Sequence, residues 1–139
     1  MAKEFGVDGS VRFFNPLPLR QIAGVMAKAD LGVVPKRADG FGNEAFSTKI
    51  MEFMSVGVPV IVSETKIDRY YFSDSGVRFF EPGNADALSQ AMAEVLENPG
   101  IRCQMVDKAL EYVSRNSWAN RKAEYLRLVD KLIGASADV

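Results

Sequence analysis

Histidine is absent from all 139 residues of the chain. Without an imidazole, Ser-His-Asp and Cys-His mechanisms are excluded, as are the common zinc sites and the usual general base near neutral pH. Any chemistry must therefore use carboxylates, amines or hydroxyls, or be purely electrostatic.

Cysteine is almost as scarce, since Cys103 is the only one. An intrachain disulfide is therefore impossible, and a metal site built from thiolates is not expected. Cys103 lies in the helical pattern IRCQMVDKAL. Cysteine is frequently buried in proteins, so we expect a structural role for it.

An excess of charge of either sign is also missing. The 17 basic and 18 acidic side chains give a net charge of −1, so the chain has no electrostatic footprint for nucleic acid. No apolar run is long enough to span a membrane, and Met1 leads directly into amphipathic AKEFGV rather than a signal peptide. We expect a cytoplasmic protein, or one at the cytoplasmic face of a membrane.

Short apolar runs alternate with longer helical patterns, which is typical of parallel βαβ construction. At 139 residues and 47% hydrophobic content, the chain is long enough for one core. The sequence predicts an α/β fold with a Rossmann-like open parallel sheet of about four strands. The strands are expected at residues 11–14, 31–35, 58–63 and 77–80.

Helices are predicted from apolar residues that recur at spacings of three and four. Gly57 is a good left-handed cap for the second of them. In an open sheet of this kind, ligands bind beyond the carboxyl ends of the strands. The expected helices are 19–29, 47–56, 85–97, 101–115 and a last one that begins after residue 117, with a short helical turn at 66–72.

Ser47, Thr48 and Lys49 begin the predicted helix 47–56, directly after a glycine-bearing loop. Free backbone amides and the positive end of the helix dipole favour an anion there. The competing interpretation is that the Ser47 hydroxyl only caps the helix, as hydroxyls do in any protein. Lys49 either adds a mobile positive charge to the anion site or pairs with Glu52 on the helix surface.

Glu52 lies about 6 Å beyond Thr48 along the helix, at 1.5 Å per residue. A carboxylate one turn past a phosphate site can accept hydrogen bonds from the hydroxyls of a ribose. Burying the Glu52 carboxylate without a partner would cost on the order of several kcal/mol, as it does for any unpaired charge. The alternatives are a pair with Lys49 and a pose that faces solvent.

The segment EAFSTKIMEFMSVGVPVIVS resembles the donor-binding signature of retaining, GT-B-fold glycosyltransferases of family four. That signature has two glutamates separated by seven residues, then Gly-x-Pro-Val and a hydrophobic strand. The flanking segments VRFFNPLPLRQIAGVMAKADLGVVPK and GVRFFEPGNADALSQAMAEVLENP are similar to the family as well. The resemblance extends over about residues 10 to 133.

The resemblance implies a role for each glutamate. Glu44 would be the catalytic-site residue that contacts hydroxyls of the transferred sugar, and Glu52 would bind the ribose of the nucleotide. The family retains the anomeric configuration through an oxocarbenium-like transition state, in which the departing diphosphate is stabilised electrostatically. No metal and no cofactor besides the nucleoside-diphosphate sugar is required.

The remaining donor contacts that the resemblance implies come from two segments. The diphosphate would be held at Ser47, Thr48 and Lys49, and the base would meet backbone near Phe14 to Leu17.

This sequence departs from the family pattern at two places. The family follows its first glutamate with Gly-Phe-Gly, whereas Glu44 is followed by Ala-Phe-Ser. Gly40-Phe41-Gly42 comes earlier, after Asp39, but Asp39 lies thirteen positions before Glu52, which is too many. The stretch 65–68 also lacks the glycines that the family has there, so the geometry on the acceptor side is expected to differ.

The resemblance implies a single partial domain over residues 1–139, with a nucleotide-sugar-binding core at 10–97 and C-terminal helices at 101–133. A whole enzyme of this family has two Rossmann-like domains, and the first two strands of the second domain have no counterpart here. Strand 31–35 would then have an open edge, which repacks against 11–14 or pairs with another copy. The expected partners are a homo-oligomer or a separate N-terminal domain, with peripheral membrane association of the whole enzyme.

The leading hypothesis is therefore the donor-binding portion of a retaining glycosyltransferase, inactive when isolated, with an acceptor that the sequence does not name. A non-catalytic nucleotide-binding module and a flavodoxin-like interaction domain remain the alternatives.

Overall fold

A computed structural model of the chain describes residues 1–135 and shows an α/β fold with an open parallel sheet. The strands are β1 (Gly32–Val34), β2 (Val60–Ser63) and β3 (Arg78–Phe80), in the spatial order β1-β2-β3. Gly32 pairs with Val60, and Ile61 pairs with Arg78.

Every helix expected from the sequence forms, and two short ones are added. The added elements are a 3₁₀ turn, η1, and a helix of five residues, α2, in the glycine-bearing segment before α3. The helical elements are η1 (Asp8–Ser10), α1 (Leu19–Met26), α2 (Gly40–Glu44), α3 (Thr48–Ser55), α4 (Lys66–Tyr71), α5 (Ala85–Glu97), α6 (Pro99–Arg115) and α7 (Trp118–Ala135).

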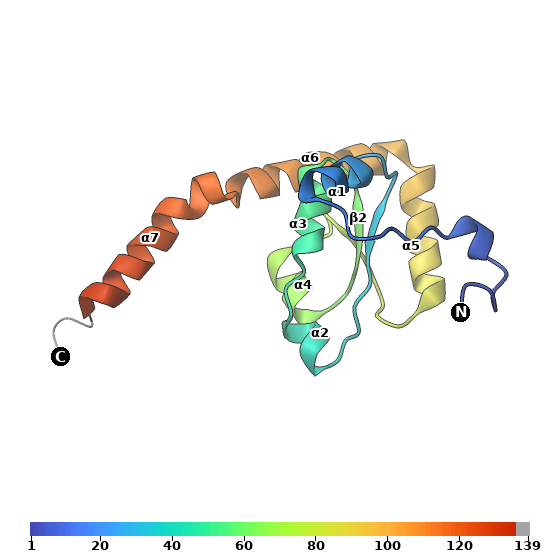
Figure 1. Cartoon of the computed structure of the whole chain (residues 1–139), viewed down its shortest axis with the longest axis horizontal. Helices are drawn as coiled ribbons and strands as arrows, with labels where there is room; N and C mark the ends of the chain where they lie inside the picture. The colour runs from blue at the N-terminus through green and yellow to red at the C-terminus, as the bar shows by residue number, and fades with distance from the viewer. Residues whose placement is uncertain (136–139) are drawn as a thin grey trace.

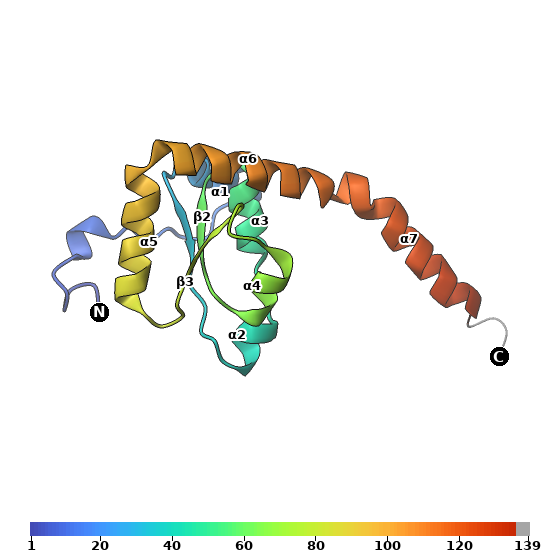
Figure 2. The same ribbon diagram turned by 180° about the vertical axis from the view of Figure 1, so that it is seen from behind.

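The helices form layers around the sheet (Figures 1 and 2). Helix α3 covers one face and α5 the other, while α6 crosses the end of the sheet at which the strands begin. At the opposite end, where β1 finishes, lies α2 (Figure 1). The carboxyl ends of the strands are thus left free of long helices.

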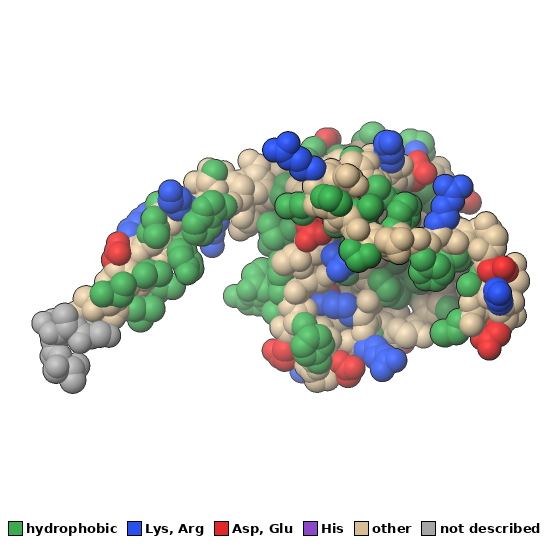
Figure 3. Space-filling model, viewed as in Figure 1, with side chains coloured by type: hydrophobic (Ala, Val, Ile, Leu, Met, Phe, Trp, Pro, Cys, Tyr) green, Lys and Arg blue, Asp and Glu red, His purple; other side chains and the backbone are tan. Residues whose placement is uncertain are grey.

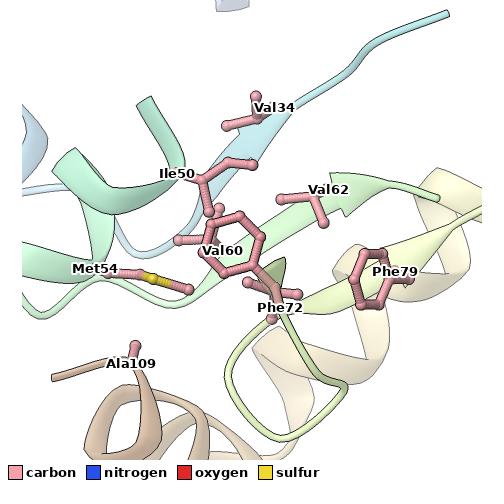
Figure 4. Close-up of a cluster of buried hydrophobic side chains, with 9 residues drawn as sticks. Val34, Ile50, Met54, Val60, Val62, Phe72, Phe79 and Ala109 are labelled. Carbon is pink, nitrogen blue, oxygen red and sulfur yellow. The ribbon is translucent and has the colours of Figure 1, made fainter. Parts of the chain in front are cut away.

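Two apolar clusters hold these layers together. On the α3 side, Ile50 and Met54 pack on Val60 and Val62 with Phe72, as Figure 4 shows. On the α5 side, Ile61 and Phe80 pack on Ala91 and Val95. Helix α6 contributes to both clusters through Ala109 and Met105, so it locks the two layers to each other.

The strand predicted at residues 11–14 does not form. These residues are in no strand, and the Phe13 side chain is 89% exposed. A strand is stabilised by a hydrogen-bonded neighbour and by burial, and the described chain offers this segment neither. The open edge of β1 therefore stays unpaired within residues 1–135, and the expected repacking of 11–14 onto it does not occur.

Helix α7 projects away from the sheet (Figures 1 and 2). Its contact with the body is at the end of α6, and the Trp118 and Tyr125 rings lie 5.6 Å apart on its surface. Hydrophobic side chains lie along the surface of α7 in Figure 3. Trp118, Leu128 and Ile133 of this helix are exposed. Within residues 1–135, no helix is both long and apolar enough to cross a membrane.

Candidate functional site

The predicted donor site lies where β1 and β2 end. The backbone N–H of Lys36, just past β1, donates to the Ser63 hydroxyl at the end of β2 over 2.7 Å. This bond joins the carboxyl ends of β1 and β2 through two residues that lie 27 positions apart in sequence. The loop that carries the candidate residues therefore starts from a fixed point.

Helix α2 shapes the first half of that loop. The Asp39 carboxylate accepts a hydrogen bond from the Gly42 N–H over 2.7 Å and so caps the helix. Gly42 is buried, and a Cβ at this position would lie 1.8 Å from the Arg37 carbonyl oxygen. Asp39 and Gly42 thus have a local structural role.

The amino end of α3 is open. Ser47 occupies the N-cap position with extended backbone, but its side chain makes no capping hydrogen bond. Thr48 and Lys49 are exposed. The arrangement in which the Ser47 hydroxyl satisfies the helix-start amides is therefore not the one in the structure, and the positive end of the helix dipole is accessible to an anion.

Glu52 faces solvent on α3. The helix buries Ile50 and Met54, and at 100° per residue this directs Glu52 to the opposite side, in line with Thr48 one turn earlier. Among the described ion pairs there is none between Lys49 and Glu52. Of the alternatives, the structure shows the solvent-facing pose, so the expected cost of burial does not arise.

Glu44 is the last residue of α2 and is exposed. The two residues after it are anchored. The Ala45 carbonyl accepts a hydrogen bond from Lys36 Nζ over 2.9 Å, and the Phe46 ring packs on Tyr71 and Phe72 at centroid distances of 4.9 and 5.9 Å. Both glutamates are thus exposed, with Glu44 before the start of α3 in the sequence and Glu52 after it.

Phe14 and Leu17 lie elsewhere. They line a cavity of about 390 Å³ that is formed by residues between Phe14 and Met26 alone. The cavity includes none of residues 44–52, so the structure does not bring these two residues together with the other predicted donor contacts.

A second cavity, of about 310 Å³, opens at the carboxyl end of the sheet on the α5 side. It was not predicted from the sequence, because its walls come from three strand ends and the start of α5, which are far apart in the chain. None of the predicted donor residues lines it. Its lining consists of Pro35, Lys36, Arg37, Ser63, Phe80, Gly83, Asn84, Ala85 and Leu88.

Sequence reasoning also missed a buried ion pair. Lys36 Nζ lies 2.7 Å from Asp68 Oδ2, and the Asp68 side chain is fully buried. Thr65, which caps α4, donates its hydroxyl to the same oxygen over 2.8 Å. The spacing Thr65-x-x-Asp68 at the start of an expected helix is a capping signal that could have identified Asp68, but its pairing with Lys36 depends on the sheet.

Within residues 1–135, no group of three or more histidine, cysteine, aspartate or glutamate side chains is arranged so that it could hold a metal ion.

The chain is similar in sequence to curated proteins that are named as glycosyltransferases. It is 28% identical over 134 residues to the D-inositol 3-phosphate glycosyltransferase of Corynebacterium glutamicum (strain R), covering 96% of this chain and 31% of that protein. It is 27% identical over 132 residues to the phosphatidyl-myo-inositol mannosyltransferase of Mycolicibacterium smegmatis, covering 94% of this chain and 33% of that protein. The chain spans about a third of the length of these relatives.

Solved structures share the fold. The sucrose-phosphate synthase of Thermosynechococcus elongatus matches with a TM-score of 0.86 at 22% identity, over 96% of this chain and 33% of that one. Anabaena Alr3699/HepE, solved in complex with UDP, matches with a TM-score of 0.75 at 16% identity, over 94% of this chain and 35% of that one.

The family model described as glycosyl transferases group 1 matches residues 1–112, which is most of the chain. The resemblance inferred from the two glutamates and the Gly-x-Pro-Val stretch is thereby confirmed at the level of the family. The chain belongs to the glycosyl transferases of group 1.

Proposed function

We propose that this chain is the donor-binding portion of a retaining glycosyltransferase that uses a nucleoside-diphosphate sugar. The observation that carries the proposal is the open start of α3, where the Ser47 side chain leaves the helix uncapped and Thr48 and Lys49 are exposed. A helix start of this kind provides backbone N–H groups and a positive dipole end for a diphosphate. Family membership makes glycosyl transfer the reaction in which such a site would serve.

Glu52 is proposed to accept hydrogen bonds from the ribose hydroxyls. It lies one turn after Thr48 on the same outward face of α3, and no described side chain competes for its carboxylate. Hydrogen bonds to a charged acceptor contribute about 1.5–3 kcal/mol. A single carboxylate here can therefore account for about a tenfold or larger share of the affinity for the nucleotide.

Glu44 is proposed to contact the transferred sugar. It precedes the α3 start in the chain, at the end of α2, whereas Glu52 follows that start. A donor whose diphosphate sits at Ser47 and Thr48 is proposed to reach Glu44 with its sugar and Glu52 with its ribose. The departing diphosphate would be stabilised by the helix start and by Lys49, with retention of configuration and without a metal ion. The acceptor and the parts of the site that complete catalysis are proposed to come from another domain, and the location is proposed to be the cytoplasm.

Titration calorimetry with UDP, GDP and the corresponding nucleotide sugars tests this proposal. Glu52→Ala should weaken binding about tenfold or more whether or not a sugar is attached, whereas Glu44→Ala should matter only when the sugar is present. Glu97→Ala, which removes an exposed glutamate at the end of α5, is the matched control and should change nothing.

The outcomes separate the functions. Equal losses for both ligands in Glu44→Ala would contradict the sugar contact of Glu44. Binding in which the sugar never adds affinity would favour the non-catalytic nucleotide-binding module instead. No binding of any nucleoside diphosphate would refute the donor site.

A further inference from the structure

Lys36 is shared between two acceptors beneath the candidate donor site. Its Nζ lies 2.7 Å from Asp68 Oδ2 and donates to the Ala45 carbonyl over 2.9 Å. The lysine side chain is only 13% exposed and the aspartate is not exposed at all. One buried ammonium group therefore connects α4 to the segment that leads into α3.

Two further bonds hold the same loop. The Lys36 N–H donates to the Ser63 hydroxyl, which fixes the loop to the end of β2. The Asn43 side-chain oxygen accepts from the Lys66 N–H at the start of α4 over 3.2 Å. Between Lys36 and Ser47 the chain is thus fastened at its beginning, near its middle and at Ala45, two residues before α3 starts.

Stability alone does not explain this pair. Taking a lysine and an aspartate out of water costs on the order of several kcal/mol per ion, and the attraction between the two charges does little more than offset this cost. Proteins in which such a pair is replaced by apolar residues are often equally stable. Asp68 is moreover only partly satisfied, because its Oδ1 has no hydrogen-bond partner among the described residues. The pair instead sets a position: Asp68 holds the Lys36 ammonium group in place, and this group in turn fixes where the Ala45 carbonyl lies.

We propose that Lys36, oriented by Asp68, is a positioning residue that fixes the turn from Ala45 into α3 and so preorganises the helix-start amides for a diphosphate. The inference rests on the proposed function, because it assigns a purpose to the turn only if a diphosphate binds there. A fixed site avoids the cost of ordering the turn during binding. The pair acts through the backbone and does not itself contact the donor.

The double variant Lys36→Met/Asp68→Asn removes both charges while keeping the size of each side chain. It avoids the unpaired buried carboxylate that Lys36→Met alone would leave. The control is Arg78→Met/Glu94→Gln, which removes the ion pair between β3 and α5, away from the loop. For all three proteins, amide hydrogen exchange of residues 45–50, the affinity for UDP and GDP, and the unfolding temperature are measured.

We expect exchange at residues 45–50 to become at least about tenfold faster in Lys36→Met/Asp68→Asn, with about a tenfold loss of diphosphate affinity. The unfolding temperature should stay within about 5 °C of the wild type. The control variant should keep both the exchange rates and the affinity. Should the double variant not fold, Asp68→Asn is measured in its place, with the same expected directions.

If the wild type binds a nucleoside diphosphate and the double variant binds it equally well, or keeps the same exchange rates, the positioning role is overturned while the proposed function stands. If the wild type binds none, the proposed function fails and the positioning role fails with it.

Discussion

At the scale of single residues, Gly42 is a position where the backbone leaves no room for a side chain. A Cβ there would lie 1.8 Å from the Arg37 carbonyl oxygen, and that contact is with backbone, which cannot rotate away. Gly40 in the same short helix has nothing within 4 Å of its would-be Cβ. Both residues are glycines of the same short helix, but only Gly40 has room for a larger side chain.

We therefore predict that Gly42→Ala destabilises the chain and Gly40→Ala does not. Overpacking typically costs about 1–3 kcal/mol, whereas alanine in an open helical position gains about 0.5–1 kcal/mol over glycine. Urea unfolding of both variants measures the difference. Equal stabilities would show that the loop relaxes without cost.

Residue-level prediction from sequence succeeded where the signal was local. Gly57 closes α3 with φ of +74°, as its position after an apolar helical run indicated. The bond from Lys36 to Asp68 could not be predicted in the same way. It joins residues on two elements whose proximity follows only from the pairing of β1 with β2.

At the scale of elements, α5 was predicted with its observed bounds, Ala85–Glu97. Asn84 explains why, because its side chain accepts from the Ala87 N–H and marks the start unambiguously. The strand expected at 11–14 was wrong because a short, largely apolar run such as VRFF forms a strand only when a neighbour pairs with it. Helix α1 formed as expected, but its apolar residues such as Leu19 are exposed rather than packed on a sheet.

Helix α6 provides a test of pH dependence. The hydrogen bond from Lys108, together with the charge of Arg115, holds the pKa of Glu111 below its ordinary value. A lowered pKa in the folded state stabilises the fold at any pH above the unfolded pKa, and this contribution is lost as the pH falls through the folded pKa.

The unfolding temperature of the wild type should therefore exceed that of Glu111→Gln at pH 7, and the difference should shrink as the pH falls through the lowered pKa of Glu111. Because these groups are exposed, 1 M salt should also reduce it, since the screening length is then about 3 Å. A difference that persists in acid would contradict this origin.

At the scale of the whole molecule, β1 forms one of the two edges of the described sheet. Residues 31–35 contain no charged or polar side chain. Strand β1 therefore lacks the charged residues that usually keep an edge strand from pairing with another chain. Strands that are apolar throughout are typical of the interior of parallel sheets. Because residues 11–14 do not pair with β1, the remaining prediction is that β1 pairs with another copy of the chain.

The body should fold without α7. Among residues 118–134 only Val129 is even half-buried, so truncation after Ser117 should keep a cooperative transition within about 5 °C of that of the whole chain. Truncation after Asn98 also removes Met105 and Ala109 from the two cores and should abolish that transition. Circular dichroism on heating distinguishes the two. Loss of cooperativity in the first truncation would mean that α7 supports the core.

The chain has one tryptophan, and it stands at the joint between α6 and α7 with 62% of its surface in water. Its fluorescence therefore reports on the junction between α6 and α7. A partner that binds against α7 and shields Trp118 from water should shift the emission to shorter wavelength, without an added label.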